Sequence, residues 1–421
     1  MEPQRRGGSP VSAVLRNADF RLIWWVGTLH EFARRMELLV LSWLILQVTD
    51  SYLQLGLVPV FNNLPRPLIS LFSGLLADRV NRHRILFAAQ LVKTLTVALI
   101  LYVIAFDFDL LRPWHVFLAI TVQGAAKTIE DPSRRTAIMD IVGERRLVNA
   151  LSLDVISNTA GKIAGPLLGG VLLDTVDFSG AYLVVLVVHT LNLGMVARLR
   201  IPLQQASRLD VSVLRSLGEA ITYAVRSPML VGLLYVTILM NALAFPVQQF
   251  IPAIGRDHLG VGATLVGLLV AAEGFGQLGG AGMMSITRRV RFHGRVFVAG
   301  SVAVLALTLI FVWSPWYTLA FALRAVGGIG QSGFSTMQSA ITMLAAPHGM
   351  RGRMMGLLSF CIGVGTPLGA LEIGALAAVF SIQGAISANA IAGLLLIVPA
   401  LVFTSLITRP LTQPPPARTD T

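Results

Sequence analysis

Long apolar runs alternate with short polar connections along nearly the whole chain. About twelve of these runs reach the roughly 20 residues that an α-helix needs to cross the hydrocarbon core of a bilayer. The pattern therefore predicts an all-α integral membrane protein with about twelve transmembrane helices. The predicted spans are 21–46, 54–77, 85–106, 114–136, 151–173, 180–198, 229–253, 262–285, 295–313, 316–342, 353–379 and 384–407.

The longest polar connection divides the chain into two halves of six spans each. After Asp210, a plausible N-cap, apolar residues follow at spacings of three, four and three, which predicts an amphipathic helix on the membrane surface. A repeat of about 200 residues relates Gly165-Pro166 to the later Thr366-Pro367 and predicts two related halves. The predicted parts are a cytoplasmic segment 1–19, a first six-helix half 20–200, a linker with the amphipathic helix 201–228, a second six-helix half 229–408 and a disordered tail 409–421.

Composition supports a membrane protein. Of the 421 residues, 55% are hydrophobic and 13% are charged, and the mean hydropathy of +0.73 lies outside the usual range for soluble domains. A net charge of +12 could suggest nucleic acid, but the cations lie in particular loops rather than in a patch with aromatic residues. The single cysteine, Cys361, excludes an internal disulfide and a cysteine-based metal site.

The distribution of arginine predicts the orientation of the chain. Arginines are concentrated in alternate loops, whereas the other loops carry mostly aspartate, so the arginine-rich side is predicted to be cytoplasmic. Both termini then lie in the cytoplasm, and the protein is expected in the cell membrane, as a multi-pass protein of a bacterial inner membrane. The arginines of these loops include Arg79, Arg82, Arg84, Arg134, Arg135, Arg145, Arg146, Arg288, Arg289, Arg291, Arg295, Arg351 and Arg353.

A highly charged hairpin at 74–86 connects the second and third spans. Small side chains at its start allow close helix approach, Asp78 places a carboxylate where the helix meets water, and the arginines follow. The N-terminal dipole of span 353–379 would attract the carboxylate of Asp78, which predicts a cytoplasmic latch. The predicted gating residues are Gly74, Asp78, Arg79, Arg82 and Arg84.

The fifth span contains a run of glycines four residues apart. These glycines free one helix face for close packing, and Pro166 removes a backbone donor and bends the helix. A generic helix-packing role is the alternative to a hinge. The predicted hinge residues are Gly161, Gly165, Pro166, Gly169 and Gly170.

Both motifs resemble those of the major facilitator superfamily. The hairpin resembles its G-x-L-a-D-R-x-x-R-R signature, with Asn81 where glycine is usual, and the glycine run resembles the antiporter motif of its exporters, with Ser152 where the extended pattern begins with glycine. Short strings such as Leu64-Pro65-Arg66 resemble the branch that includes macrolide and enterobactin exporters. The resemblance implies two six-helix bundles, alternating access, and a central cavity lined by the first, fourth, seventh and tenth spans.

Charges inside the spans are the candidate functional residues, because each costs about 2.5–3.5 kcal/mol at a helix centre on insertion scales. The first span holds His30, Glu31, Arg34, Arg35 and Glu37. Glu31 and Arg35 can pair at i, i+4 as a structural ion pair, but we favour a functional cluster in which Glu31 or Glu37 carries a proton. The proton-coupling and cavity candidates are Glu31, Arg34, Arg35, Glu37, Lys127, Glu130, Asn241, Gln248, Glu273, Arg324 and Gln331.

Two of these candidates have open alternatives. Lys127 and Glu130, three residues apart, can form a local ion pair or contact substrate. Glu273 can bind a proton or form an ion pair. Lys93, Lys162 and Glu372 also lie within spans, and for the last two we favour packing or pairing between bundles.

The sequence contains no zinc-protease H-E-x-x-H, Walker or nucleophile-elbow motif, so we expect neither an enzyme nor a cofactor. The predicted function is proton-coupled efflux of an amphipathic organic molecule by a monomer surrounded by membrane lipids. An excess of mid-span cations suggests an anionic or zwitterionic substrate. A facilitator, an importer or a lysophospholipid flippase of the same fold is the alternative, followed by a membrane-embedded enzyme or receptor.

Overall fold

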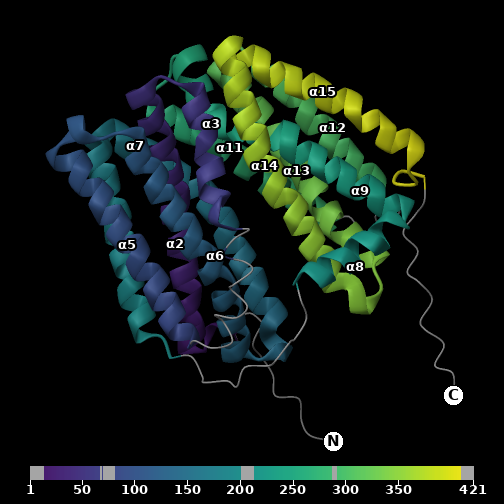
Figure 1. The fold of residues 1–421 in the computed structure, drawn as a ribbon, viewed down its shortest axis with the longest axis horizontal. Helices are drawn as coiled ribbons and strands as arrows, with labels where there is room; N and C mark the ends of the chain where they lie inside the picture. The colour runs from purple at the N-terminus through teal and green to yellow at the C-terminus, as the bar shows by residue number, and fades with distance from the viewer. Residues whose placement is uncertain (1–13, 67–68, 70–80, 201–212, 287–291, 409–421) are drawn as a thin grey trace, which may run out of the picture. The chain divides into compact units, whose positions relative to one another are not determined.

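The computed structural model describes residues 14–66, 69, 81–200, 213–286 and 292–408, and these are helical with no strand (Figure 1). The predicted all-α fold is confirmed. The helices correspond to the predicted apolar runs because backbone groups in a bilayer must be satisfied within the segment itself.

In the first half, side chains before the helices set where they start. The Asn17 side chain accepts hydrogen bonds from the backbone of Asp19 and Phe20, and the Ser51 side chain accepts one from Gln54. The helices of this half are α2 (Ala18–Thr49), α3 (Tyr52–Asn63), α5 (Arg82–Phe106), the short η1 (Phe108–Leu110), α6 (Pro113–Val142) and α7 (Glu144–Arg198).

The long helix α7 consists of two spans. Its backbone leaves helical values at Val176 and Asp177, where φ of Asp177 is +58°. This break falls between the predicted fifth and sixth spans. The helix continues through Pro166 without a break in its helical dihedral angles.

The second half contains one irregular span. Residues 228–258 pass from α9 (Pro228–Leu239) through the π-helix η2 (Met240–Ala244), the 3₁₀-helix η3 (Phe245–Phe250), α10 (Ile251–Ala253) and the π-helix η4 (Ile254–His258). Regular helices follow: α11 (Ala263–Ile286), α12 (His293–Phe311), α13 (Tyr317–Ala345), η5 (His348–Met350), α14 (Arg351–Val379) and α15 (Ile382–Phe403).

The predicted amphipathic helix in the linker is α8 (Val213–Val225). Its apolar side packs against the protein: Ala220 and Ala224 are buried, and Tyr223 donates a hydrogen bond to the carbonyl of Ala345 at 3.1 Å. Glu219 forms an ion pair with Arg353 at the start of α14. This side of α8 therefore covers the second half instead of lying on lipid.

The chain forms two compact units, 1–209 with 251–271 and 210–250 with 272–421. Segment 251–271, which the sequence analysis places in the second half, groups with the first unit because Arg256 bonds the Leu46 carbonyl and Asp50 at the end of α2. In the first unit, α2 lies alongside α7 and α5 alongside α6 (Figure 1).

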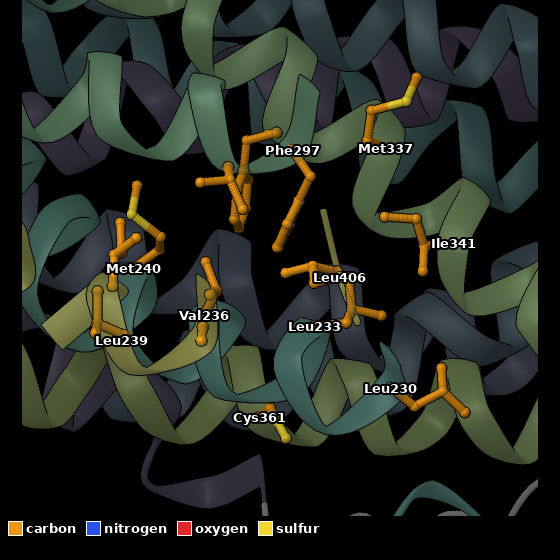
Figure 2. Close-up of a cluster of buried hydrophobic side chains, with 14 of the residues drawn as sticks. Leu230, Leu233, Val236, Leu239, Met240, Phe297, Met337, Ile341, Cys361 and Leu406 are labelled. Atoms are coloured by element: carbon orange, nitrogen blue, oxygen red, sulfur yellow. The ribbon is translucent and has the colours of Figure 1, made fainter. Parts of the chain in front are cut away.

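The core of the second unit is apolar. Side chains from α9, α12, α13 and α14, among them Leu233, Val236, Phe297 and Ile341, converge in one cluster (Figure 2). Cys361 lies at the edge of this cluster and is buried. Its position agrees with its prediction as a residue inside an apolar span.

Seven of the described helices are long and apolar enough to cross a membrane. Helices α2 and α6 are not among them, because each carries several ionisable side chains near its middle. Both helices, and therefore these charges, belong to the first unit.

Candidate functional site

In the charged segment of α2, Glu31 forms ion pairs with two arginines. The carboxylate lies 2.6 Å from Nη2 of Arg34 and 3.9 Å from Nε of Arg35. The sequence analysis paired Glu31 with Arg35, but the nearer partner is Arg34, one turn away. Glu31 is thus compensated by two guanidinium groups.

Glu37 has a different environment. Its side chain is 3% exposed and lies between α6 and the second span of α7. Gln123 donates to Oε1 of Glu37 at 2.5 Å, and the Tyr182 hydroxyl donates to the same oxygen at 3.4 Å. Among the described residues no lysine or arginine lies within ion-pair distance of Glu37, whereas Glu31 has such a partner.

Glu130 pairs across helices. Its carboxylate binds Nζ of Lys93 on α5, and both side chains are almost fully buried. The expected alternative, a local pair with Lys127, is wrong, because Glu130 turns toward α5 and away from its neighbour on α6. Nζ of Lys93 also lies 3.5 Å from Nε2 of His30.

These groups form two polar layers within the first unit. His30 lies 12 residues after the start of α2, and Glu130 lies 12 residues before the end of the antiparallel α6. Glu37 is seven residues further along α2, or about 10 Å at the helical rise. Glu37, which has no cation within ion-pair distance among the residues that the structure describes, therefore lies one layer away from the buried Lys93–Glu130 pair.

The gating hairpin is only partly visible. Gly74, Asp78 and Arg79 lie outside the described residues, so the latch remains a prediction. Arg82 forms an ion pair with Asp140 of α6, and Arg84 lies in the first turn of α5. Arg134 makes a bidentate pair with Asp154 of α7, at 2.7 and 2.9 Å.

The hinge motif presents two faces. A Cβ added at Gly161, Gly165 or Gly169 would lie within 2.7 to 3.3 Å of atoms in α2, between Glu31 and Met36. Gly170 faces α11 instead, where a Cβ would lie 2.2 Å from the carbonyl of Ala263. The glycines therefore seat α7 directly against the charged segment of α2, while Gly170 allows contact with α11.

We expect Gly165→Ala to destabilise the protein by about 1–3 kcal/mol, because the new methyl group would lie 2.7 Å from Cβ of Arg35. Gly194→Ala, on the same helix but with no atom within 4 Å, is the matched control. Thermal unfolding in detergent measures both. Equal melting temperatures for the two variants would contradict the tight α2–α7 contact.

The second unit has its own ionic site. Arg324 of α13 pairs with Glu273 of α11, and Gln248 lies beside both. With Gln331, these side chains line one small cavity. Four of the predicted cavity residues are thus brought together within this unit.

Asn241 is separated from that cavity. It donates to the Thr237 carbonyl at 2.8 Å and accepts from Thr366 of α14 at 3.2 Å. In a regular α-helix, Asn241 and Gln248 would share a face, but the π- and 3₁₀-turns between them change the helical period. Asn241 therefore joins the contact with α14.

Ion pairing reduces the excess of cations that suggested an anionic substrate. Arg34 and Arg35 share Glu31, Lys93 has Glu130, and Arg324 has Glu273. Lys127 is another cation inside a span, and it has no ion pair within 4.0 Å among the described residues.

Some polar partners were missed by the sequence analysis. Tyr182, Gln277 and His189 were treated as parts of apolar spans, yet they hydrogen-bond Glu37, Glu273 and Gln90, respectively. A lone polar side chain in a span is the only signal that could have found them. Among the described residues no cluster of three or more His, Cys, Asp or Glu could hold a metal ion.

A family model described as "Transmembrane secretion effector" matches residues 9–412. The chain belongs to this family, within the major facilitator superfamily. The superfamily assignment predicted from the two motifs is confirmed, and the protein is a secondary transporter and not an enzyme.

Several curated relatives are named as exporters or efflux pumps. The chain is 23% identical to the "Multidrug efflux pump Tap" of Mycolicibacterium fortuitum, over 81% of this chain and 85% of that protein. It is 25% identical to the "Enterobactin exporter EntS" of Citrobacter koseri, over 88% of each. The fold resembles the crystal structure of the nucleoside transporter NupG, with a TM-score of 0.74 and 12% identity over 92% of this chain and 99% of that chain. These relatives and the apolar helices establish a multi-pass membrane protein that carries a small molecule.

Proposed function

We propose that this transporter exports an amphipathic organic molecule, such as a drug or a siderophore, in exchange for protons, and that Glu37 carries the proton. The observation that supports it is the environment of Glu37: a buried carboxylate that is hydrogen-bonded by Gln123 and Tyr182 and that has no lysine or arginine within ion-pair distance in the described part of the chain. A buried carboxylate without a compensating charge is more easily protonated than one in an ion pair.

Glu31 is a weaker candidate for the same role. Its two guanidinium neighbours favour the ionised form, so a proton would have to displace an existing ion pair. We therefore assign the transported proton to Glu37 and not to Glu31.

The proposed cycle places both termini in the cytoplasm, with the arginine-rich loops inside. The two six-helix bundles, 20–200 and 229–408, alternate access to the substrate. Substrate loads from the cytoplasm while Glu37 is ionised, and a proton from outside then favours release and return.

Everted membrane vesicles test the proposal. With an acidified lumen, we expect uptake of ethidium or enterobactin that collapses when a protonophore is added, because uptake into such vesicles corresponds to export from the cell. Vesicles without the protein are the control. Protein-dependent transport that ignores the proton gradient would instead support a facilitator, an importer or a flippase of the same fold.

A further inference from the structure

The cavity in the second unit has a free volume of about 20 Å³. This is room for one water-sized group. Apolar, aromatic and polar side chains line it together. Its lining includes Phe245, Glu273, Thr308, Phe311, Arg324 and Gln331.

Glu273 is already fully engaged. It accepts hydrogen bonds from Arg324 and from Gln277 at 2.9 Å. With the Gln248 amide turned so that its nitrogen faces Glu273, Gln248 donates to both carboxylate oxygens, at 3.2 and 2.6 Å. With these donors its acceptor positions are occupied, so Glu273 fixes the orientation of the Arg324 guanidinium and neutralises its charge.

Arg324, in contrast, keeps unused donors. The side chain is 10% exposed, and its bond to Glu273 uses Nη2 alone. The Nε atom is buried and has no hydrogen-bond partner, and the guanidinium lies over the Phe311 ring at 5.7 Å. Buried donors in native proteins are generally paired, so the Arg324 guanidinium has donor capacity left for an acceptor in the cavity beside it.

From this geometry we infer that the cavity is a recognition site for one neutral hydrogen-bond acceptor of the substrate, such as an ester, lactone or amide carbonyl oxygen, which binds the free N–H groups of Arg324. The inference rests on the proposed function, since it describes the molecule that is carried. An acceptor without charge fits because the Arg324–Glu273 pair is neutral as a whole and a full anion would face the Glu273 carboxylate.

The size of the cavity limits what enters it. One oxygen atom fills the available space, and the remainder of the substrate stays outside the cavity. A bulky anionic group such as a phosphate does not fit. The site thereby selects amphipathic molecules whose acceptor group is an uncharged carbonyl, over the anionic substrate that the sequence alone suggested.

A matched pair of dyes tests the site. Tetramethylrhodamine methyl ester and tetramethylrosamine are both cationic and differ in one ester group. Fluorescence anisotropy with the purified full-length protein in detergent measures their affinities. We expect the ester to bind about tenfold more tightly, as for one added hydrogen bond to a charged group.

Two variants assign the preference to the cavity. Arg324→Lys keeps the charge but removes the Nε donor, and Gly327→Val adds bulk to a lining position where a Cβ meets no atom within 4 Å. In both, the preference for the ester should fall below about twofold. Arg295→Lys, at an exposed position on α12 in the same unit, should keep it. Melting temperatures establish that the variants are folded, and Gly327→Val carries the test if Arg324→Lys does not fold.

Equal affinity for the two dyes in the unmodified protein, no binding of the ester, or an unchanged preference in Gly327→Val would overturn the inference. The measurement uses no membrane and no proton gradient. A failure of proton coupling therefore leaves it intact, and a failure of dye discrimination leaves proton-driven transport intact.

Discussion

Glu37→Gln is expected to abolish proton-driven accumulation while substrate exchange continues. The amide keeps the shape of Glu37 and can still accept from Gln123, but it cannot bind and release a proton at physiological pH. A gradient of about one pH unit supports roughly tenfold accumulation for each coupled proton, and the variant should lose this factor.

Proteoliposomes measure both activities on one preparation. Accumulation of ethidium under a pH gradient should fall to the level without a gradient, whereas counterflow without a gradient should stay within about twofold of the unmodified protein. Glu31→Gln is the contrasting variant, because its carboxylate is held by Arg34. If Glu31→Gln uncouples transport and Glu37→Gln does not, the proton carrier is Glu31.

Lys93→Met is expected to produce the largest loss of stability. It leaves the carboxylate of Glu130 buried without a cation, and removing one partner of a buried ion pair destabilises proteins by about 3–5 kcal/mol. His30, at 3.5 Å from Nζ of Lys93, also loses its nearest polar neighbour.

Adding Glu130→Leu to Lys93→Met should restore most of that stability, since an apolar pair of similar volume removes both buried charges. Unfolding by denaturant titration in detergent gives the free energy of each single variant and of the double variant. Additive losses in the double variant would show that the pair contributes little coupling. A polar replacement of an exposed side chain, Arg112→Gln, controls for general effects of charge.

The apolar spacing was sufficient to locate the spans. Helices α5, α11, α14 and α15 begin and end within about four residues of their predicted limits. The predicted gap between the fifth and sixth spans coincides with the break at Asp177. A helix needs about 20 apolar residues to cross a bilayer, and a run of that length can be recognised in the sequence alone.

The partners of the buried charges could not be predicted in the same way. Spacing along one helix suggested Glu31 with Arg35 and Lys127 with Glu130, since only neighbours on the same helix are visible in a sequence. The structure instead joins Glu130 to Lys93, 37 residues away in the chain. Similarly, the π- and 3₁₀-turns of the seventh span separate Asn241 from Gln248, which a regular period placed on one face.

The sequence by itself determined that this chain is an all-α multi-pass transporter of the major facilitator superfamily, because span length, arginine distribution and two motifs are local properties. Only the tertiary structure decided which of its buried charges are compensated. That distinction depends on contacts between helices far apart in the chain, and it is what separates Glu37 from Glu31 and gives Arg324 unused donors beside a cavity.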